Sequence, residues 1–198
     1  LRPEVDLVTT PAGDLAGMSH ANNFTADLNG WVDLFRQFSQ LNGRNVDDGT
    51  LYGELFRAAI GEDADPDAGG LLAYPFRTGV FLAGLAEGRP LFVRGPEARF
   101  SLANFMRAQL FGAFSPVTIG MNVMTEDEGV EIDSLVGHGG IFATPVVAQR
   151  ILAAAFNTPI RVMTTASEGG AWGMAVLADY LRHADLTLAD YLDDVVFA

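Results

Sequence analysis

The chain has 198 residues, 49% of them hydrophobic, and its 12 Lys+Arg and 25 Asp+Glu give a formal net charge of −13. It contains no cysteine, and every basic residue is an arginine, which excludes thiolate metal sites, disulfides, Schiff-base catalysis and a P-loop lysine. The acidic balance argues against a nucleic-acid or anionic membrane surface, because both need a basic footprint.

The N-terminal segment predicts a hairpin and then a helix. Residues 5–10 and 15–20 are extended in pattern, and the Pro-Ala-Gly-Asp stretch between them is typical of a turn. From Asn29 the apolar residues recur at three- and four-residue steps as far as Leu41, which predicts an amphipathic helix. Gly43 is placed to end it.

The next segment combines a helix, a polar loop and two short strands. A second helix is predicted to start at Asp47 or Asp48. Residues 61–70 are rich in Asp, Gly and Pro, which predicts a mobile surface loop that is short for a domain linker. Residues 71–76 and 91–94 are apolar runs bounded by glycine and proline, as short strands are.

A long helix is predicted after Ser101, whose side chain can cap the helix start. Its apolar pattern runs towards Met124. Pro116 lies inside this pattern and predicts a kink or an interruption, because proline has no N–H to donate.

The last third alternates strands and helices. Strands are predicted at 132–136 and 160–163, and helices at 145–156, 169–182 and 188–196. This alternation implies parallel strands joined by helical crossovers, and therefore an α/β fold.

Two further expectations concern the location of the protein and the extent of the chain. No run reaches the roughly 18 apolar residues of a membrane span, and residues 1–4 lack the regions of a signal peptide. We therefore expect a cytoplasmic protein. The chain opens on Leu1 rather than methionine, as a piece of a longer polypeptide would.

The first candidate site is Gly137-His138-Gly139-Gly140, between a predicted strand and a predicted helix that has Pro145 at its first position. Glycines at such a turn let a ligand approach the backbone, and free amides at a helix start favour an anion such as phosphate. A tight strand-to-helix connection without a ligand is the alternative.

The second candidate is the stretch from Ser167 through Glu168-Gly169-Gly170 to Gly173, again between a strand and a helix. Its small residues would allow close packing against a strand or a bound ring. Ser167 could be read as a hydrolase nucleophile, but the residue two before it is Thr165 rather than glycine.

The other polar residues give little support for a site. The three histidines, His20, His138 and His183, have no metal-ligand spacing, so no metal site is predicted. The acidic run 126–128 is expected to be a solvated helix end.

Taken together, the two glycine turns resemble the C-terminal half of the FGGY carbohydrate kinases. The similarity is carried by the stretch from Gly137 to Pro145, then Gln149-Arg150, and then the stretch from Glu168 to Ala175. It implies an actin-like ATPase fold, in which each lobe is a mixed, ribonuclease H-like sheet flanked by helices. Residues 1–198 would form the C-terminal, nucleotide-binding lobe.

The resemblance also assigns residues to ATP. Gly139 and Gly140 would run beside the phosphates and ribose, and Thr144 would stand near the adenosine. The turn that contains Glu168, Gly169 and Gly170 would help to form the floor of the pocket. Thr78-Gly79-Val80 falls where many members have Gly-Glu-Arg, so this turn lacks the family's acid.

The family's catalytic aspartate and phosphate loops have no counterpart in these residues, so the resemblance implies no catalytic residue here. The N-terminal sugar-binding lobe would be absent, and this lobe would be inactive alone. The intact enzyme would transfer phosphate from ATP with Mg²⁺ to a pentulose, xylulose first and ribulose second. A homodimer is left open. The alternative is a non-catalytic actin-like protein that binds nucleotide or assembles.

Overall fold

The computed structural model describes residues 5–197. The sequence prediction about a signal peptide concerns residues 1–4, which lie outside the described residues. Its helices and strands, in chain order, are β1 (Asp6–Thr9), β2 (Leu15–Met18), α1 (Ala26–Leu41), α2 (Asp48–Ala58), β3 (Leu71–Tyr74), β4 (Leu91–Arg94), α3 (Leu102–Asn122), β5 (Leu135–Gly137), α4 (Val147–Phe156), β6 (Ile160–Val162), α5 (Gly169–Tyr180) and α6 (Leu188–Tyr191). In this part of the chain, no helix combines the length and apolarity needed to cross a bilayer.

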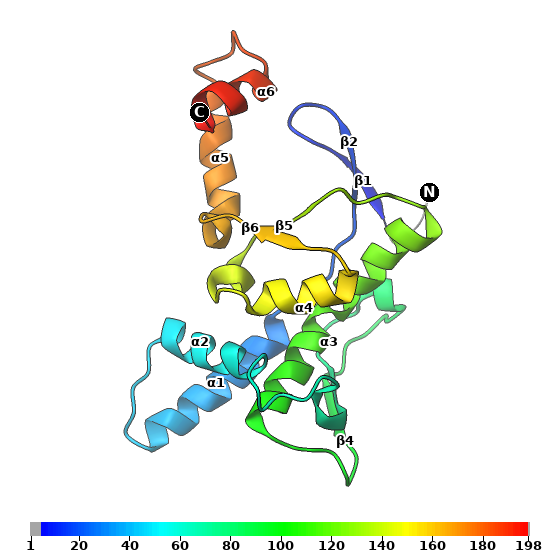
Figure 1. Ribbon diagram of the computed structural model, residues 1–198, viewed down its shortest axis with the longest axis vertical. Helices are drawn as coiled ribbons and strands as arrows, with labels where there is room; N and C mark the ends of the chain where they lie inside the picture. Colours follow the sequence, from blue (N-terminus) through cyan, green and yellow to red (C-terminus); the bar gives the residue numbers. More distant parts are fainter. Residues whose placement is uncertain (1–4, 198) are drawn as a thin grey trace.

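Helix α3 runs through the middle of the body, with α1, α2 and α4 around it (Figure 1). Its buried side chains pack with apolar residues of these helices and with Leu71 of β3. The ring of Phe105 lies 4.9 Å from that of Trp31 and 5.1 Å from that of Phe92. Edge-to-face contacts of this kind add to the free energy gained from apolar burial. One hydrophobic core therefore joins the helices.

The start of α3 is confirmed; of the kink or interruption predicted at Pro116, the interruption is wrong. The Ser101 side chain accepts a hydrogen bond from the backbone N–H of Asn104, at 3.2 Å. The helix then continues through the buried Pro116 as far as Asn122. Proline cannot donate to the carbonyl four residues earlier, but the Ser115 hydroxyl donates to that carbonyl, of Gly112, at 2.8 Å. This replacement bond satisfies the acceptor that proline leaves open.

The strands form three separate pairs rather than one mixed sheet. The predicted hairpin is confirmed as the antiparallel pair β1–β2, and β3–β4 is antiparallel as well. β5 and β6 are parallel, with α4 between them, as the alternating pattern predicts. Within residues 5–197 no ladder joins one pair to another. Pro159 lacks the N–H needed to extend β6 backwards, and the chain turns after Gly137, so both strands stay short.

The loop at 61–70, expected to be mobile, is tied to α3 by polar side chains. Arg107 donates to the carbonyls of Ala59 at 2.7 Å, Ala64 at 3.1 Å and Asp65 at 2.7 Å. The buried Asn104 accepts from the backbone N–H of Asp65 and donates to its carboxylate, each at 2.7 Å. The loop composition could not reveal this, because the partners lie about forty residues further on.

The C-terminal helices form a unit that extends from the body on the same side as the β1–β2 hairpin (Figure 1). Tyr191 of α6 is buried, and its hydroxyl donates to the Asp179 carboxylate at 3.1 Å. The Tyr180 hydroxyl donates to the carbonyl of Leu186 at 2.8 Å. Helix α5 has no buried residue although it is rich in apolar side chains, and Met174 is 70% exposed.

The hydrogen bonds from Arg107 to the carbonyls of residues 59, 64 and 65, called here the Arg107 tether, are expected to stabilise the fold, and this can be tested. Replacing Arg107 with methionine should lower the free energy of unfolding by about 2–3 kcal/mol, since hydrogen bonds from a charged group to three carbonyls are lost. Urea unfolding measures this. Arg150→Met, on the exposed face of α4, makes the same change at an exposed helical site and should cost little. Equal losses in the two variants would contradict the tether.

Candidate functional site

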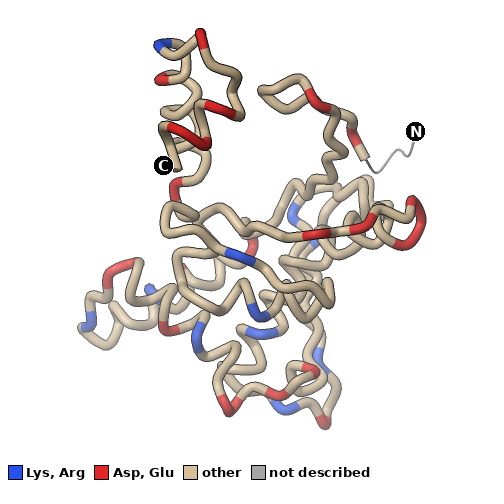
Figure 2. The backbone as a smooth tube through the Cα atoms, turned by 45° about the horizontal axis from the view of Figure 1, so that its top comes forward, with Lys and Arg blue, Asp and Glu red and all other residues tan. Residues whose placement is uncertain are grey.

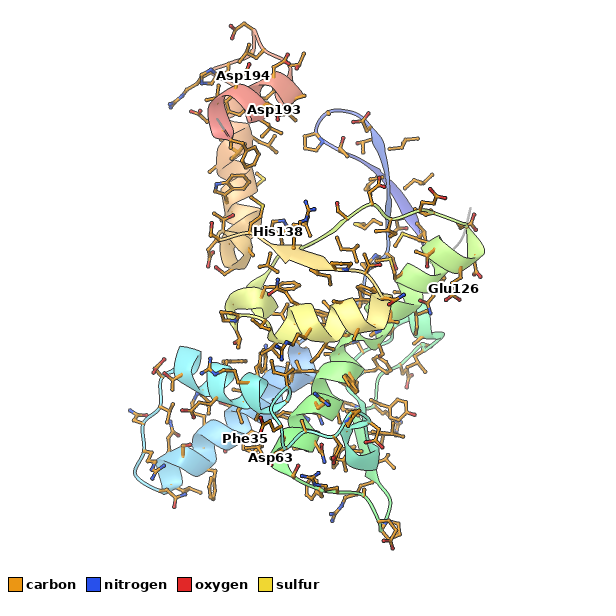
Figure 3. All side chains as sticks on the ribbon, in the orientation of Figure 1. Phe35, Asp63, Glu126, His138, Asp193 and Asp194 are labelled. Atoms are coloured by element: carbon orange, nitrogen blue, oxygen red, sulfur yellow. The ribbon has the colours of Figure 1, made fainter. Side chains whose placement is uncertain are left out.

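The two predicted glycine turns lie against each other at the ends of the parallel strands β5 and β6. The backbone N–H of Gly139 donates to the carbonyl of Ala166 at 2.7 Å, which links the first turn to the second. His138 lies between the end of β5 and the base of α5 (Figure 3). A Cβ on Gly169 would come within 2.7 Å of the His138 ring nitrogen Nδ1, so glycine at 169 leaves room for this ring.

The first turn depends on its glycines in two different ways. Gly139 has a φ of +108°, which side chains with a Cβ rarely adopt. Gly137 is buried, and a Cβ there would overlap the ring of Phe142. The chain continues as a short 3₁₀ turn, Gly140–Ala143, before α4. Helix α4 begins at Val147, two residues later than Pro145, which was predicted to occupy its first position.

This turn forms one wall of a cavity of about 540 Å³. The other walls come from the start of α1 and from α2. The residues that line the cavity are Phe24, Thr25, Asn29, Asp48, Gly49, Tyr52, Phe56, His138, Gly139, Gly140, Ile141, Ala143 and Thr144. A cavity of this size, with apolar walls and a few polar groups, is typical of a small-molecule site.

Two sets of hydrogen bonds hold polar side chains at the α1–α2 wall. The Tyr52 hydroxyl donates to Asn29 Oδ1 at 3.0 Å. Arg36 donates to Asp48 Oδ1 from Nε at 3.2 Å and from Nη2 at 2.9 Å, and it also pairs with Asp33. Burial raises the pKa of Tyr52 above its ordinary value of 10.0, so its hydroxyl is a protonated donor at neutral pH.

The predicted cofactor-binding residues fall into two groups. Gly139, Gly140 and Thr144 line the cavity, and Thr144 is buried. Glu168, Gly169 and Gly170 do not line it; they lie at the base of α5, where Gly169 packs against His138. Of these three residues, Gly169 meets the cavity indirectly, through the His138 ring.

A second cavity of about 340 Å³ lies next to the first, and Ala143 lines both. The segments that follow β5 and β6 form its walls, and Ser167 is among its residues. Ser167 is exposed and belongs to the 3₁₀ turn Ala166–Glu168, which precedes α5. The chain from β5 to α4 thus separates two hollows.

The sequence did not single out the α1–α2 side of the main cavity. In the sequence, Asn29 marks only the start of one predicted helix, and Tyr52 lies inside another. No local motif marks them, because the two residues are 23 positions apart and meet only through helix packing.

No metal site appears in the described residues. Among residues 5–197, no group of three or more His, Asp or Glu side chains is arranged to hold an ion. These residues therefore do not fit a protein cage for Mg²⁺, and we assign no metal ligand to them.

Comparison with models of known protein families gives a match over most of the chain. The family model of the FGGY family of carbohydrate kinases, C-terminal domain, matches residues 1–181. Neither the curated proteins nor the solved structures include a significant match to the chain.

The turn geometry can be tested at Gly137. Gly137→Ala should lower the free energy of unfolding by about 1–3 kcal/mol, because the added Cβ overlaps a ring in a packed site. Gly140→Ala is the matched control, since a Cβ there meets nothing within 4 Å. Thermal or urea unfolding measures both. Adding Phe142→Ala should make the Gly137 substitution less costly, and a purely additive double variant would contradict the overlap.

Proposed function

The chain belongs to the FGGY family of carbohydrate kinases, and on that basis we propose that it is the nucleotide-binding lobe of an ATP-dependent sugar kinase. The main cavity would hold ATP, and the sugar would be a pentulose such as xylulose. The sugar-binding lobe and the catalytic base would be supplied by the same polypeptide outside these 198 residues. ATP as the phosphate donor fits the cytoplasmic location expected from the sequence.

The observation that carries this proposal is the Gly139-Gly140 turn, which follows the parallel strand β5 and opens onto the 540 Å³ cavity. In α/β folds, ligands bind beyond the carboxyl ends of parallel strands. Glycines at such a turn allow a phosphate to approach the backbone amides. The apolar side chains on the opposite wall, Phe24 and Phe56, suit a nucleobase.

In the proposed mechanism, this lobe binds the nucleotide and the other lobe supplies the sugar site and the catalytic base. A sugar hydroxyl would attack the γ-phosphorus in line, its proton would pass to a base in the other lobe, and ADP would leave. Mg²⁺ bound to the phosphates would neutralise their charge. This chain's residues would bind the nucleotide and fix its direction. Because the chain has no lysine and no arginine is among the described residues that line the cavity, its phosphate contacts would come mainly from backbone amides.

Exposed apolar surface supports the assignment of this chain to one lobe of a larger enzyme. On the hairpin, Leu7 is 58% and Leu15 76% exposed, and on the C-terminal unit Leu181 is 78% exposed. Such side chains on extended elements are typical of a surface that another domain covers. A free-standing binding module would instead be expected to bury them.

The alternative, a non-catalytic actin-like protein, has weaker support. Both readings predict glycine turns at a nucleotide, so the turns alone do not separate them. The matched family consists of carbohydrate kinases, which favours the enzyme.

Gly140 provides the direct test of the ATP site. Gly140→Val should weaken ATP binding about tenfold, the effect of losing one contact of about 1.4 kcal/mol, because the branched side chain blocks the turn. Calorimetric titration of the chain with ATP measures this. Gly95→Val is the matched control: Gly95 also has open space around its Cβ but lies in the loop after β4. Equal ATP affinity in wild type and Gly140→Val would contradict the site.

A second test concerns activity. The purified 198-residue chain should release no ADP in response to xylulose or ribulose with ATP and Mg²⁺, because its residues include no assigned catalytic base. A coupled assay for ADP measures this. Sugar-dependent ADP release by the chain alone would contradict the assignment of catalysis to the other lobe.

A further inference from the structure

We infer that Asn29, anchored by a hydrogen bond from Tyr52, selects adenine over guanine nucleotides in the main cavity; this inference rests on the proposed ATP site. Asn29 lies in the first turn of α1 and Tyr52 in the middle of α2. Both side chains line the same cavity as Gly139 and Gly140, on a wall formed by other elements. They are therefore placed to meet the base when the glycine turn holds the phosphates.

A hydrogen bond from Tyr52 anchors the Asn29 amide at the cavity. The Tyr52 hydroxyl donates to Oδ1 at 3.0 Å, which restricts the rotation of the Asn29 side chain. The oxygen keeps one lone pair, and within residues 5–197 the Nδ2 group has no recorded protein acceptor. Asn29 thus presents one donor beside one acceptor.

That pair of groups matches one edge of adenine. Adenine offers the acceptor N7 beside the amino group at C6, and an asparagine amide bonds both at once. Guanine has the carbonyl oxygen O6 in place of the amino group, so O6 would face Oδ1 with two acceptors and no proton between them. Asp48 lies on the same wall, and its carboxylate is also an acceptor. The Asn29 oxygen therefore disfavours O6, whereas the Asp48 carboxylate is already paired with Arg36.

The bond between Asn29 and Tyr52 is not needed to hold α1 against α2. The two helices already share a buried apolar interface that includes Leu28, Val32, Leu51 and Leu55. Asn29 itself is exposed to the cavity. Substitution of Asn29 should therefore change the ratio of ATP to GTP affinity while the chain stays folded. Tyr52 does not contact the base in this scheme; it positions the Asn29 side chain.

The experiment compares ATP, GTP and inorganic tripolyphosphate by calorimetric titration of the 198-residue chain. Wild type should bind ATP about tenfold more tightly than GTP, the discrimination expected from one bidentate amide–base pair. Asn29→Leu should bring the ATP-to-GTP ratio close to one and leave tripolyphosphate binding unchanged. Tyr52→Phe keeps the ring but frees the amide, so the ratio should fall to an intermediate value. Gln40→Leu removes an exposed amide from α1 outside the cavity and should keep the wild-type ratio.

The outcomes separate this inference from the proposed function. Nucleotide binding with no preference in wild type, or with an unchanged ratio in both Asn29→Leu and Tyr52→Phe, overturns the inference and leaves the ATP site standing. Absence of ATP binding to a folded wild-type chain overturns both. Thermal unfolding of each variant establishes that it is folded, and Tyr52→Phe supplies the test if Asn29→Leu does not fold.

Discussion

Helix α3 has apolar residues on nearly every face, and this forces the rest of the body to pack around it. Its buried side chains contact α1, α2, α4 and β3, so these elements have little freedom relative to one another. The consequence for the site is direct. The cavity takes one wall from α1 and α2 and the other from the turn before α4, and it exists because α3 supports both sides. Arg107 and Asn104 of α3 extend this support to the loop between α2 and β3 through their hydrogen bonds.

The sequence predicted those elements whose signals are local. Periodicity located the helices, and Ser101 marked the start of α3 correctly, because a cap needs only its own next three residues. The parallel pairing of β5 and β6 followed from a strand–helix–strand order. Features that depend on distant partners were missed. They include the hydrogen bonds that tie residues 61–70 to α3. A neighbouring residue can also change the outcome: the Ser115 hydroxyl replaces the hydrogen bond that Pro116 cannot make, so the helix continues where proline predicted an interruption.

The part of the site that has a local sequence signal was predictable, and the part that depends on distant partners was not. A glycine turn between a strand and a helix is visible in sequence, so Gly139 and Gly140 could be named in advance, and both line the cavity. The opposite wall has no such motif, since Asn29 meets Tyr52 only when two helices pack. Acidic residues are prominent on the C-terminal helices and after α3 (Figure 2). Asp48 nevertheless lines the cavity itself, so a nucleotide bound there would lie near a carboxylate that Arg36 holds by hydrogen bonds.

The separation of the strands into three pairs has a consequence for the handling of this chain. In a two-stranded ladder both strands are edges, so every strand in residues 5–197 carries backbone groups open to pairing with another molecule. The hairpin combines such edges with exposed leucines, which favours intermolecular strand addition. The net charge of −13 opposes this by mutual repulsion, and repulsion weakens as salt is added. Ionic strength is thus the variable that sets the balance between a dispersed chain and an aggregated one.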